Sequence, residues 1–180
     1  MISYMKFWDI QNNLFINNIF DKVLYNRLYG IETMLDNFNG MYELLEYSSR
    51  EGVKNTLYIS SSEVYEKKKS IEPFTEDEYG CVDILSPRSS YSSSKRAAET
   101  LCACFSDERG IKTTIVRPGH IYGPTARRND SHVSAIFSFN AADGNNLVMK
   151  SAGEQIRSWC YCLDSASAIL TVLVLSLIHI

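Results

Sequence analysis

The stretch Tyr91-Ser-Ser-Ser-Lys95 carries a tyrosine and a lysine four positions apart. On a helix, side chains at this spacing lie on one face, a single turn apart. An ammonium group beside a phenol favours the ionised phenolate, so a group with an ordinary pKa of about 10 can exchange protons near neutral pH. The pair therefore predicts proton transfer at a carbinol or carbonyl carbon, the reaction that accompanies hydride transfer to a nicotinamide.

Two further stretches flank this pair. Upstream, Leu57-Tyr-Ile-Ser-Ser-Ser-Glu-Val-Tyr65 predicts a short buried strand over 57–60 that ends in a cluster of hydroxyl groups. Downstream, Ile115-Val-Arg-Pro-Gly-His-Ile-Tyr-Gly-Pro124 predicts the end of a second strand, which Pro118 stops. A serine hydroxyl at the end of the first strand can hydrogen-bond the same reacting oxygen as Tyr91.

Helical and strand patterns alternate along the chain. Apolar spacing predicts helices over 31–50, 92–109, 131–142 and from 165 onward, and strands over 57–60, 112–116, 147–149 and 157–161. This alternation predicts a parallel sheet with helices on both faces. Ligands of such sheets bind beyond the carboxyl ends of the strands, and the long loop 67–87 is expected to cover substrate there.

Four strings, taken in order, resemble the extended short-chain dehydrogenase/reductase family of NAD-dependent sugar-nucleotide epimerases, dehydratases and decarboxylases. They are LYISSSEVY, PRSSYSSSKRAAETL, GIKTTIVRPGHIYGPT and QIRSWCYCLDSASAIL, and the resemblance covers roughly three quarters of the chain, 37–168. It implies an α/β fold, a partial Rossmann-like doubly wound parallel sheet. It also implies NAD as cofactor, a nucleotide-sugar substrate, and a homodimer formed through two helices of each subunit, one of them 92–109.

The resemblance also implies roles for five residues. Tyr91 is the acid/base for a sugar hydroxyl, and Lys95 lowers its pKa and holds the nicotinamide ribose. Ser61 falls where the family has its catalytic Ser or Thr, and Ser62 where dehydratases have an acid and decarboxylases a serine. Glu63 separates the subfamilies, because 4-epimerases usually lack an acid there, 4,6-dehydratases carry Asp-Glu, and decarboxylases carry Ser-Glu, as here. A cap of a turn or helix is the alternative role for either serine.

Four more positions are expected at the substrate. Arg88 matches a substrate contact of the decarboxylases, where a guanidinium can bind a carboxylate or phosphate with two bonds; a surface salt bridge is the alternative. Arg157 matches an arginine that acts as proton donor or substrate clamp. His120 stands where the family commonly has a substrate-binding Asn, and His132 where an Arg contacts the diphosphate. Asp164 is expected to be a helix N-cap.

The decarboxylase features point to a UDP-glucuronate decarboxylase-like enzyme, which oxidises the sugar at C4, releases CO₂ and reduces the product again. The alternatives within the class are a dTDP-glucose 4,6-dehydratase and a UDP-sugar 4-epimerase. An inactive truncated remnant without cofactor binding is the alternative of another class. One departure from the family pattern is Glu66, which follows Tyr65 where the family usually has Gly.

Both ends of the chain depart from the family. No G-x-x-G-x-x-G occurs in the 180 residues, although this turn holds the cofactor pyrophosphate in complete members. We therefore expect a fragment truncated at both ends, with an unassigned segment 1–30 and a partial domain 31–175. The last letters, LSLIHI, match what the end of a common transposase sequencing adapter encodes, so 175–180 is expected to be a non-native tail.

Composition excludes other classes of function. A net charge of −3, from 18 basic and 21 acidic residues, predicts no nucleic-acid partner. The apolar run 169–180 has 12 residues, against about 20 for a membrane span, so no membrane partner is expected. The five cysteines lack zinc-site spacing, which predicts no metal and reduced thiols in a cytoplasmic protein.

We predict that the 180-residue chain binds NAD too weakly for saturable quenching of Trp8 or Trp159 fluorescence, because it contains no glycine-rich turn for the pyrophosphate. A titration of the purified chain with NAD tests this. Saturation at micromolar NAD would contradict it.

Overall fold

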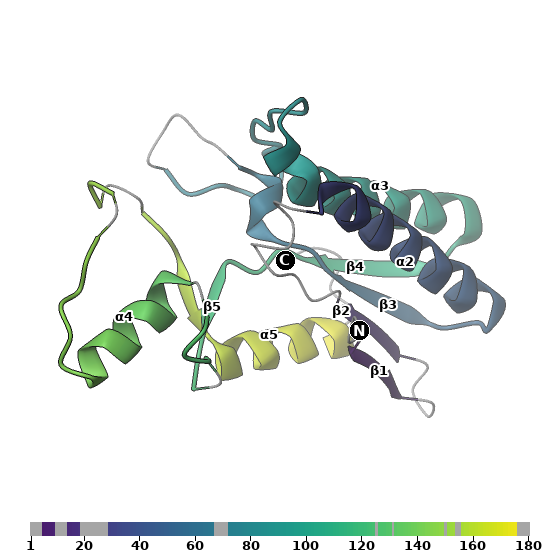
Figure 1. Ribbon diagram of the computed structural model, residues 1–180. Coiled ribbons are helices and arrows are strands. Elements are labelled where there is room, and N and C mark those ends of the chain that lie inside the picture. The colour runs from purple at the N-terminus through teal and green to yellow at the C-terminus, as the bar shows by residue number, and fades with distance from the viewer. Residues whose placement is uncertain are drawn as a thin grey trace. The chain divides into compact units, whose positions relative to one another are not determined.

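The computed structural model describes residues 5–9, 14–18, 29–66, 72–124, 126–130, 132–149, 151–153 and 156–175. They fall into two compact units, which are described separately: one runs to Pro118 and includes Ile169–Leu175, and the other is Gly119–Ala168. The elements of the chain are drawn in Figure 1. They are β1 (Met5–Asp9), β2 (Leu14–Asn18), α2 (Gly30–Arg50), β3 (Asn55–Ile59), the 3₁₀ turns η1 (Ser62–Val64) and η2 (Pro87–Ser89), α3 (Ser90–Arg109), β4 (Lys112–Val116), β5 (His120–Tyr122), α4 (Val133–Ala142), β6 (Trp159–Tyr161) and α5 (Cys162–Leu175).

The first unit contains a four-stranded sheet in the order β1-β2-β3-β4. β2, β3 and β4 are parallel, with Leu57 opposite Ile16 on one side and Thr114 on the other. β1 runs antiparallel to β2. The predicted parallel sheet is thus confirmed for three strands. β1 and β2 lie in the segment that the sequence patterns left unassigned.

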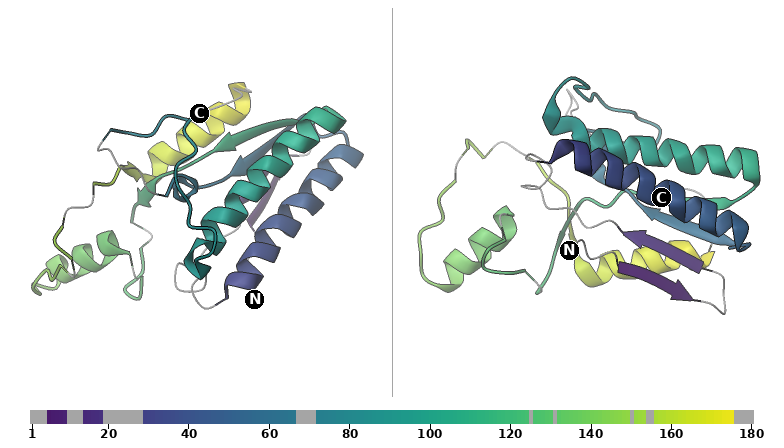
Figure 2. Two further views of the ribbon diagram at one scale, coloured as in Figure 1. Left: turned by 90° about the horizontal axis from the view of Figure 1, so that it is seen from above. Right: turned by 45° about the vertical axis from the view of Figure 1, so that its right-hand side comes forward.

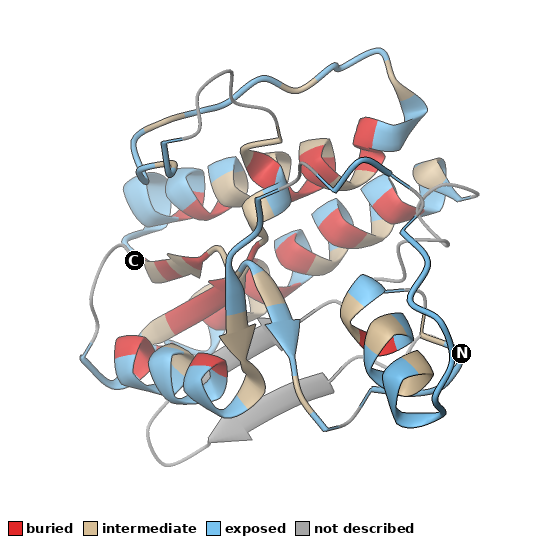
Figure 3. Cartoon of the chain, turned by 90° about the vertical axis from the view of Figure 1, so that its left-hand side faces the viewer, coloured by how far each residue is buried: buried red, intermediate tan, exposed pale blue. Residues whose placement is uncertain are grey.

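Helices cover both faces of this sheet (Figure 2). Successive side chains of a strand point to opposite faces. Tyr58 packs with residues of α2 and α3, among them Met41, in one buried apolar cluster. Its neighbour Leu57 packs with Val172 and Val116 in a second cluster, on the side of α5. The buried stripes of α2 and α3 are visible in Figure 3. The doubly wound arrangement predicted from the alternating patterns is therefore confirmed.

α3 ends where the sequence predicted. Gly110 follows the helix with a left-handed φ of 66°, and its N–H donates to the carbonyl of Ser106 at 3.1 Å. The helix starts two residues earlier than expected, at Ser90, because the η2 turn leads directly into it. Pro87 opens that turn, where its fixed φ suits a helical start.

Two expectations about the second half of the chain are wrong. Residues 147–149 are not a strand: Leu147, Val148 and Met149 are exposed, and no described strand pairs with them. An apolar run adopts strand structure only where a neighbouring strand and a packing surface exist. Asp164 is not an N-cap, because α5 begins at Cys162, directly after β6, and places Asp164 in its first turn. A carboxylate there still suits the positive end of the helix dipole.

Among the described residues, no helix combines the length and the apolar character that crossing a bilayer would need.

We predict that Leu57→Ala lowers the free energy of unfolding by about 2–5 kcal/mol, because it leaves a cavity between β3 and α5. Leu57 is fully buried, whereas Leu85 is 89% exposed, so Leu85→Ala is the matched control, with an effect below about 0.5 kcal/mol. Urea unfolding followed by circular dichroism measures both. Equal effects would place Leu57 outside the core.

Candidate active site

The chain leaves β3 beside the end of β4 and turns at once into η1. The N–H of Ser60 donates to the carbonyl of Val116 at 2.8 Å, and the N–H of Ser62 donates to the carbonyl of Pro118 at 3.0 Å. Ser61 is extended, and its Oγ accepts the N–H of Glu63 at 3.2 Å. Ser61 therefore caps η1, as the alternative reading of the serine cluster allowed. This contact uses the oxygen as acceptor, so the hydroxyl can still act as a donor.

Lys95 is held at the carboxyl end of β3. Its side chain is 1% exposed, and Nζ donates to the carbonyl of Ile59 at 2.9 Å. Nζ also lies 4.9 Å from the ring centroid of Tyr58 and 5.7 Å from that of Tyr91, distances at which a cation is attracted to an aromatic ring. The ammonium group thus lies between two phenol rings. The predicted shared face of Tyr91 and Lys95 is confirmed.

The two phenols beside Lys95 differ in burial. Tyr58 is 1% exposed, and burial is the main cause that raises its pKa well above the ordinary range, with smaller effects from Cys102 and Tyr91. Burial also raises the pKa of the Cys102 thiol to about 12. Both groups are therefore neutral over the physiological range. Tyr91 is only half-buried, which makes it the better placed phenol for proton exchange.

A hydrogen-bonded chain fixes the start of α3 against α2. Asn37 Nδ2 donates to Ser94 Oγ at 2.9 Å, and Ser94 Oγ donates to the carbonyl of Tyr91 at 2.8 Å. Nothing in the sequence pattern singled out Asn37. Its signal is a polar residue at an inward position of an apolar helical stripe, and in the structure Asn37 is 3% exposed.

Glu66 has the backbone conformation expected of the glycine that the family pattern predicts at this position. Its φ is +46°, a left-handed conformation that glycine adopts without strain, and Glu66 is the only described non-glycine residue with a positive φ. Its carboxylate accepts hydrogen bonds from Ser92 Oγ at 2.8 Å and Ser89 Oγ at 3.2 Å. These bonds offset the backbone strain and tie Glu66, two residues after η1, to Ser89 of η2 and Ser92 of α3.

The remaining predicted residues of the first unit lie on the two short turns. Glu63, on η1, and Arg88, on η2, are exposed, and Ser62 is half-buried. η1 is attached to α3, since Arg96 Nε donates to the carbonyl of Val64 at 2.7 Å. The structure therefore brings the serine cluster and the start of α3 to the same end of the sheet.

The other three predicted residues belong to the second unit. There β5 and β6 are parallel, with His120 opposite Trp159, and their ring centroids lie 5.2 Å apart. The Arg157 guanidinium contacts His120 Nε2, so these two are brought together. His132 lies just before α4, and its N–H donates to the Asp130 carboxylate at 2.9 Å. That backbone bond lowers the pKa of Asp130.

The first unit fits a cofactor with ribose hydroxyls at the end of β3. Ser60 Oγ is buried and has no hydrogen-bond partner among the described residues. An unpaired buried hydroxyl costs about 1–3 kcal/mol, so a polar partner is expected there. Ser60 follows Ile59 directly, and the carbonyl of Ile59 accepts a hydrogen bond from the Lys95 ammonium. Hydroxyl and ammonium donors at one strand end are the chemistry that holds a sugar diol.

A sheet with three parallel strands between helices, and polar side chains gathered at its carboxyl edge, is an arrangement typical of nucleotide-binding α/β proteins. The chain belongs to the NAD dependent epimerase/dehydratase family, whose model matches residues 22–176.

Three known proteins show how far this likeness extends. The UDP-glucuronic acid decarboxylase 1 of Xenopus tropicalis is 30% identical over 149 residues, which are 82% of this chain and 35% of that protein. The UDP-N-acetyl-alpha-D-glucosaminuronate decarboxylase of Bacillus cytotoxicus is 34% identical over 143 residues, 77% of this chain and 43% of that protein. The crystal structure of UDP-glucose 4-epimerase from Thermotoga maritima with UDP-glucose superimposes with a TM-score of 0.79 at 25% identity, over 89% of this chain and 52% of that one. The chain thus spans about a third to a half of the length of these relatives.

Proposed function

We propose that this site belongs to an NAD-dependent sugar-nucleotide enzyme that decarboxylates UDP-glucuronate. The observation that carries the proposal is the Lys95 ammonium, buried between Tyr91 and the end of β3, beside a Ser-Ser-Glu turn. In a parallel sheet, ligands bind at this edge. The resemblance to decarboxylases supports the choice of reaction.

Tyr91 removes the proton of the C4 hydroxyl, and the Lys95 ammonium favours the phenolate that does so. Bound NAD supplies the chemistry of hydride uptake and return. Ser61 donates a hydrogen bond to the same oxygen of the sugar. Oxidation at C4 makes the substrate a β-keto acid, which loses CO₂ once its carbonyl is polarised. The re-protonated product then regains its hydroxyl through Tyr91.

Six further residues assist in this proposal. Glu63 and Arg157 act during decarboxylation, Arg157 as proton donor or clamp on the substrate. Ser62 and Arg88 contact the sugar acid, because a hydroxyl and a guanidinium both bind carboxylate oxygens. His120 and His132 bind the substrate at the positions that the family pattern assigns.

Glu63 distinguishes the proposed reaction from its rivals. A 4,6-dehydratase moves water with an acid pair, whereas this turn carries Ser62 before the single acid Glu63. A 4-epimerase needs no acid at this position. An inactive remnant remains the alternative from another class, since the 180 residues contain no glycine-rich pyrophosphate turn.

Five free thiols favour a cytoplasmic setting for the enzyme.

We predict that the product of the complete reading frame, supplied with NAD, releases CO₂ from UDP-glucuronate and forms UDP-xylose or its keto form. Tyr91→Phe should lower kcat by about 10²–10⁴-fold, because the proton acceptor is lost. Tyr79→Phe is the matched control, since Tyr79 is 80% exposed. Mass spectrometry of the nucleotide sugars measures the products. Turnover of dTDP-glucose or UDP-galactose instead would identify a dehydratase or an epimerase, and no turnover at all would favour the remnant.

A homodimer is part of the proposal, and α2 offers the surface for it. Four large apolar side chains follow one another at helical spacing on its outer face, and all are at least 40% exposed: Ile31, Leu35, Phe38 and Tyr42. α2 and α3 pack side by side, and Tyr42 contacts Phe105 of α3 edge to face, with centroids 6.0 Å apart. A second copy of the same helix pair would cover this stripe.

We predict that Phe38→Glu converts the dimer into a monomer, because a carboxylate would be buried in an apolar contact. Leu85→Glu is the control, since Leu85 is exposed and belongs to the loop before η2, not to the α2 stripe. Sedimentation velocity of the product of the complete reading frame measures the mass. A dimer that survives Phe38→Glu places the interface elsewhere.

A further inference from the structure

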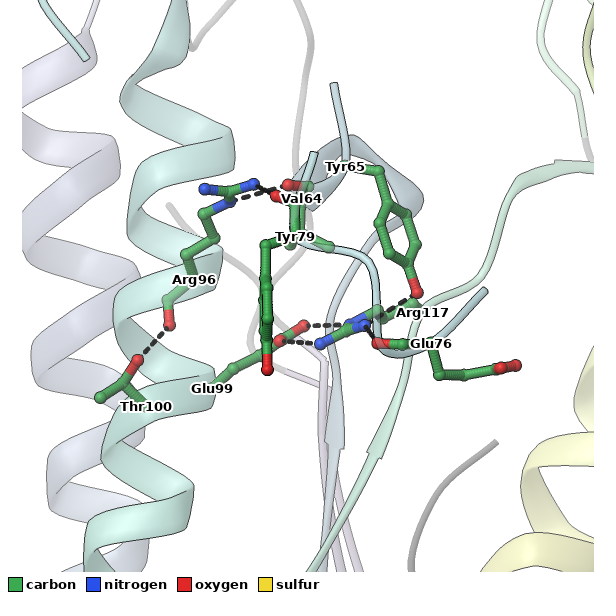
Figure 4. A network of polar contacts seen from close by, with 8 residues as sticks. All are labelled: Val64, Tyr65, Glu76, Tyr79, Arg96, Glu99, Thr100 and Arg117. Atoms are coloured by element: carbon green, nitrogen blue, oxygen red, sulfur yellow. Dashed lines mark hydrogen bonds and ion pairs between the residues drawn. The ribbon is translucent and has the colours of Figure 1, made fainter. Parts of the chain in front are cut away.

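Arg117, the first residue after β4, joins three separate parts of the first unit (Figure 4). Its Nε and one terminal nitrogen donate to the two carboxylate oxygens of Glu99 at 2.9 and 2.7 Å. Its other terminal nitrogen donates to the hydroxyl of Tyr65 at 2.8 Å and to the carbonyl of Glu76 at 3.1 Å. All three guanidinium nitrogens are therefore engaged. The bonds to Glu99 also raise the pKa of Arg117.

Each partner of Arg117 has a different place in the fold. Glu99 is on α3, one turn after Lys95 and two turns after Tyr91, on the same helix face. Tyr65 follows η1 directly, and its ring lies 5.0 Å from the guanidinium carbon and stacks on Phe74 with centroids 4.8 Å apart. Arg117 thus ties the helix that carries the Tyr–Lys pair to the turn that carries the serine cluster.

The loop over 72–81 is attached to the same turn. Arg96 of α3 donates to the carbonyl of Val64 and to the carbonyl of Tyr79. Gly80 has a φ of +56°, and a Cβ there would overlap the carbonyl of Tyr65, so the loop backbone lies directly against the turn. Only glycine permits so close an approach.

We propose that Arg117 is the positioning residue that sets the Ser61–Glu63 turn at its distance from Tyr91. Arg117 and Glu99 are mostly buried, with side-chain exposures of 23% and 11%, so their ion pair is shielded from solvent. A shift of about 1 Å between reacting groups can cost 10²-fold in rate, so the turn and the helix need a rigid connection. The effect on catalysis rests on the proposed function, whereas the connection itself does not.

Kinetics and amide exchange of the product of the complete reading frame test this. Arg117→Leu should lower kcat by about 10–100-fold with a KM change below about threefold, because the reacting groups are displaced while the substrate contacts stay. Tyr65→Phe removes only the bond to the turn, keeps the ion pair, and should lower kcat by about threefold. Arg128→Leu is the matched control, since Arg128 makes an exposed ion pair with Asp143 and should leave kcat unchanged.

Hydrogen exchange provides a readout that needs no turnover. The amides of Val64, Tyr65 and Glu66 donate hydrogen bonds within the turn. Arg117→Leu should speed the hydrogen exchange of these amides by about tenfold. The amide of Ser60 is the internal control, because it donates to Val116 of β4 and its exchange should stay unchanged. Unchanged exchange in the turn overturns the connection. Faster exchange with unchanged kcat overturns the role in catalysis. If the wild type turns over no nucleotide sugar, the proposed function fails, and the exchange of the turn alone decides whether Arg117 holds it.

Discussion

A buried ammonium group at the end of β3 is the constraint around which the first unit is arranged. Lys95 is almost inaccessible to solvent, and its Nζ donates to the last carbonyl of the strand. A lysine is almost never fully buried unless its charge is paired with polar groups or faces aromatic rings. The strand end and the two phenol rings provide such an environment, and they thereby fix the first two turns of α3 against the sheet.

The same end of the sheet is secured from two further sides. On the α2 side, the Asn37–Ser94 bond reaches the carbonyl of Tyr91 through one hydroxyl. On the loop side, Arg117 and Glu99 hold the residue that follows η1. Buried polar groups that are hydrogen-bonded hold a defined geometry, because a displacement leaves a donor or acceptor unpaired. Such rigidity suits the proposed site, in which Tyr91 and Ser61 would both contact one oxygen of the substrate.

The serine cluster combines a structural role with the catalytic role that we propose for Ser61. Ser61 caps η1 by accepting one N–H, and that bond orients the hydroxyl instead of consuming its donor. Glu66 takes a left-handed conformation that glycine adopts without strain, and its carboxylate accepts hydrogen bonds from Ser89 and Ser92 on either side of Tyr91. The turn is therefore defined by side-chain bonds to η2 and α3 as well as by its own backbone.

The sequence by itself determined the features that repeat locally. Apolar spacing located α2 and α3, Gly110 marked the end of α3, and the four-residue spacing put Tyr91 and Lys95 on one helix face. The tertiary structure alone decided which distant groups meet. The Lys95 ammonium meets a carbonyl 36 positions away, Asn37 meets Ser94 57 positions away, and β2 joins the sheet from an asparagine-rich segment without a clear pattern. Helix periodicity is a property of neighbouring residues, whereas these contacts depend on strand register and on how the helices pack across the sheet.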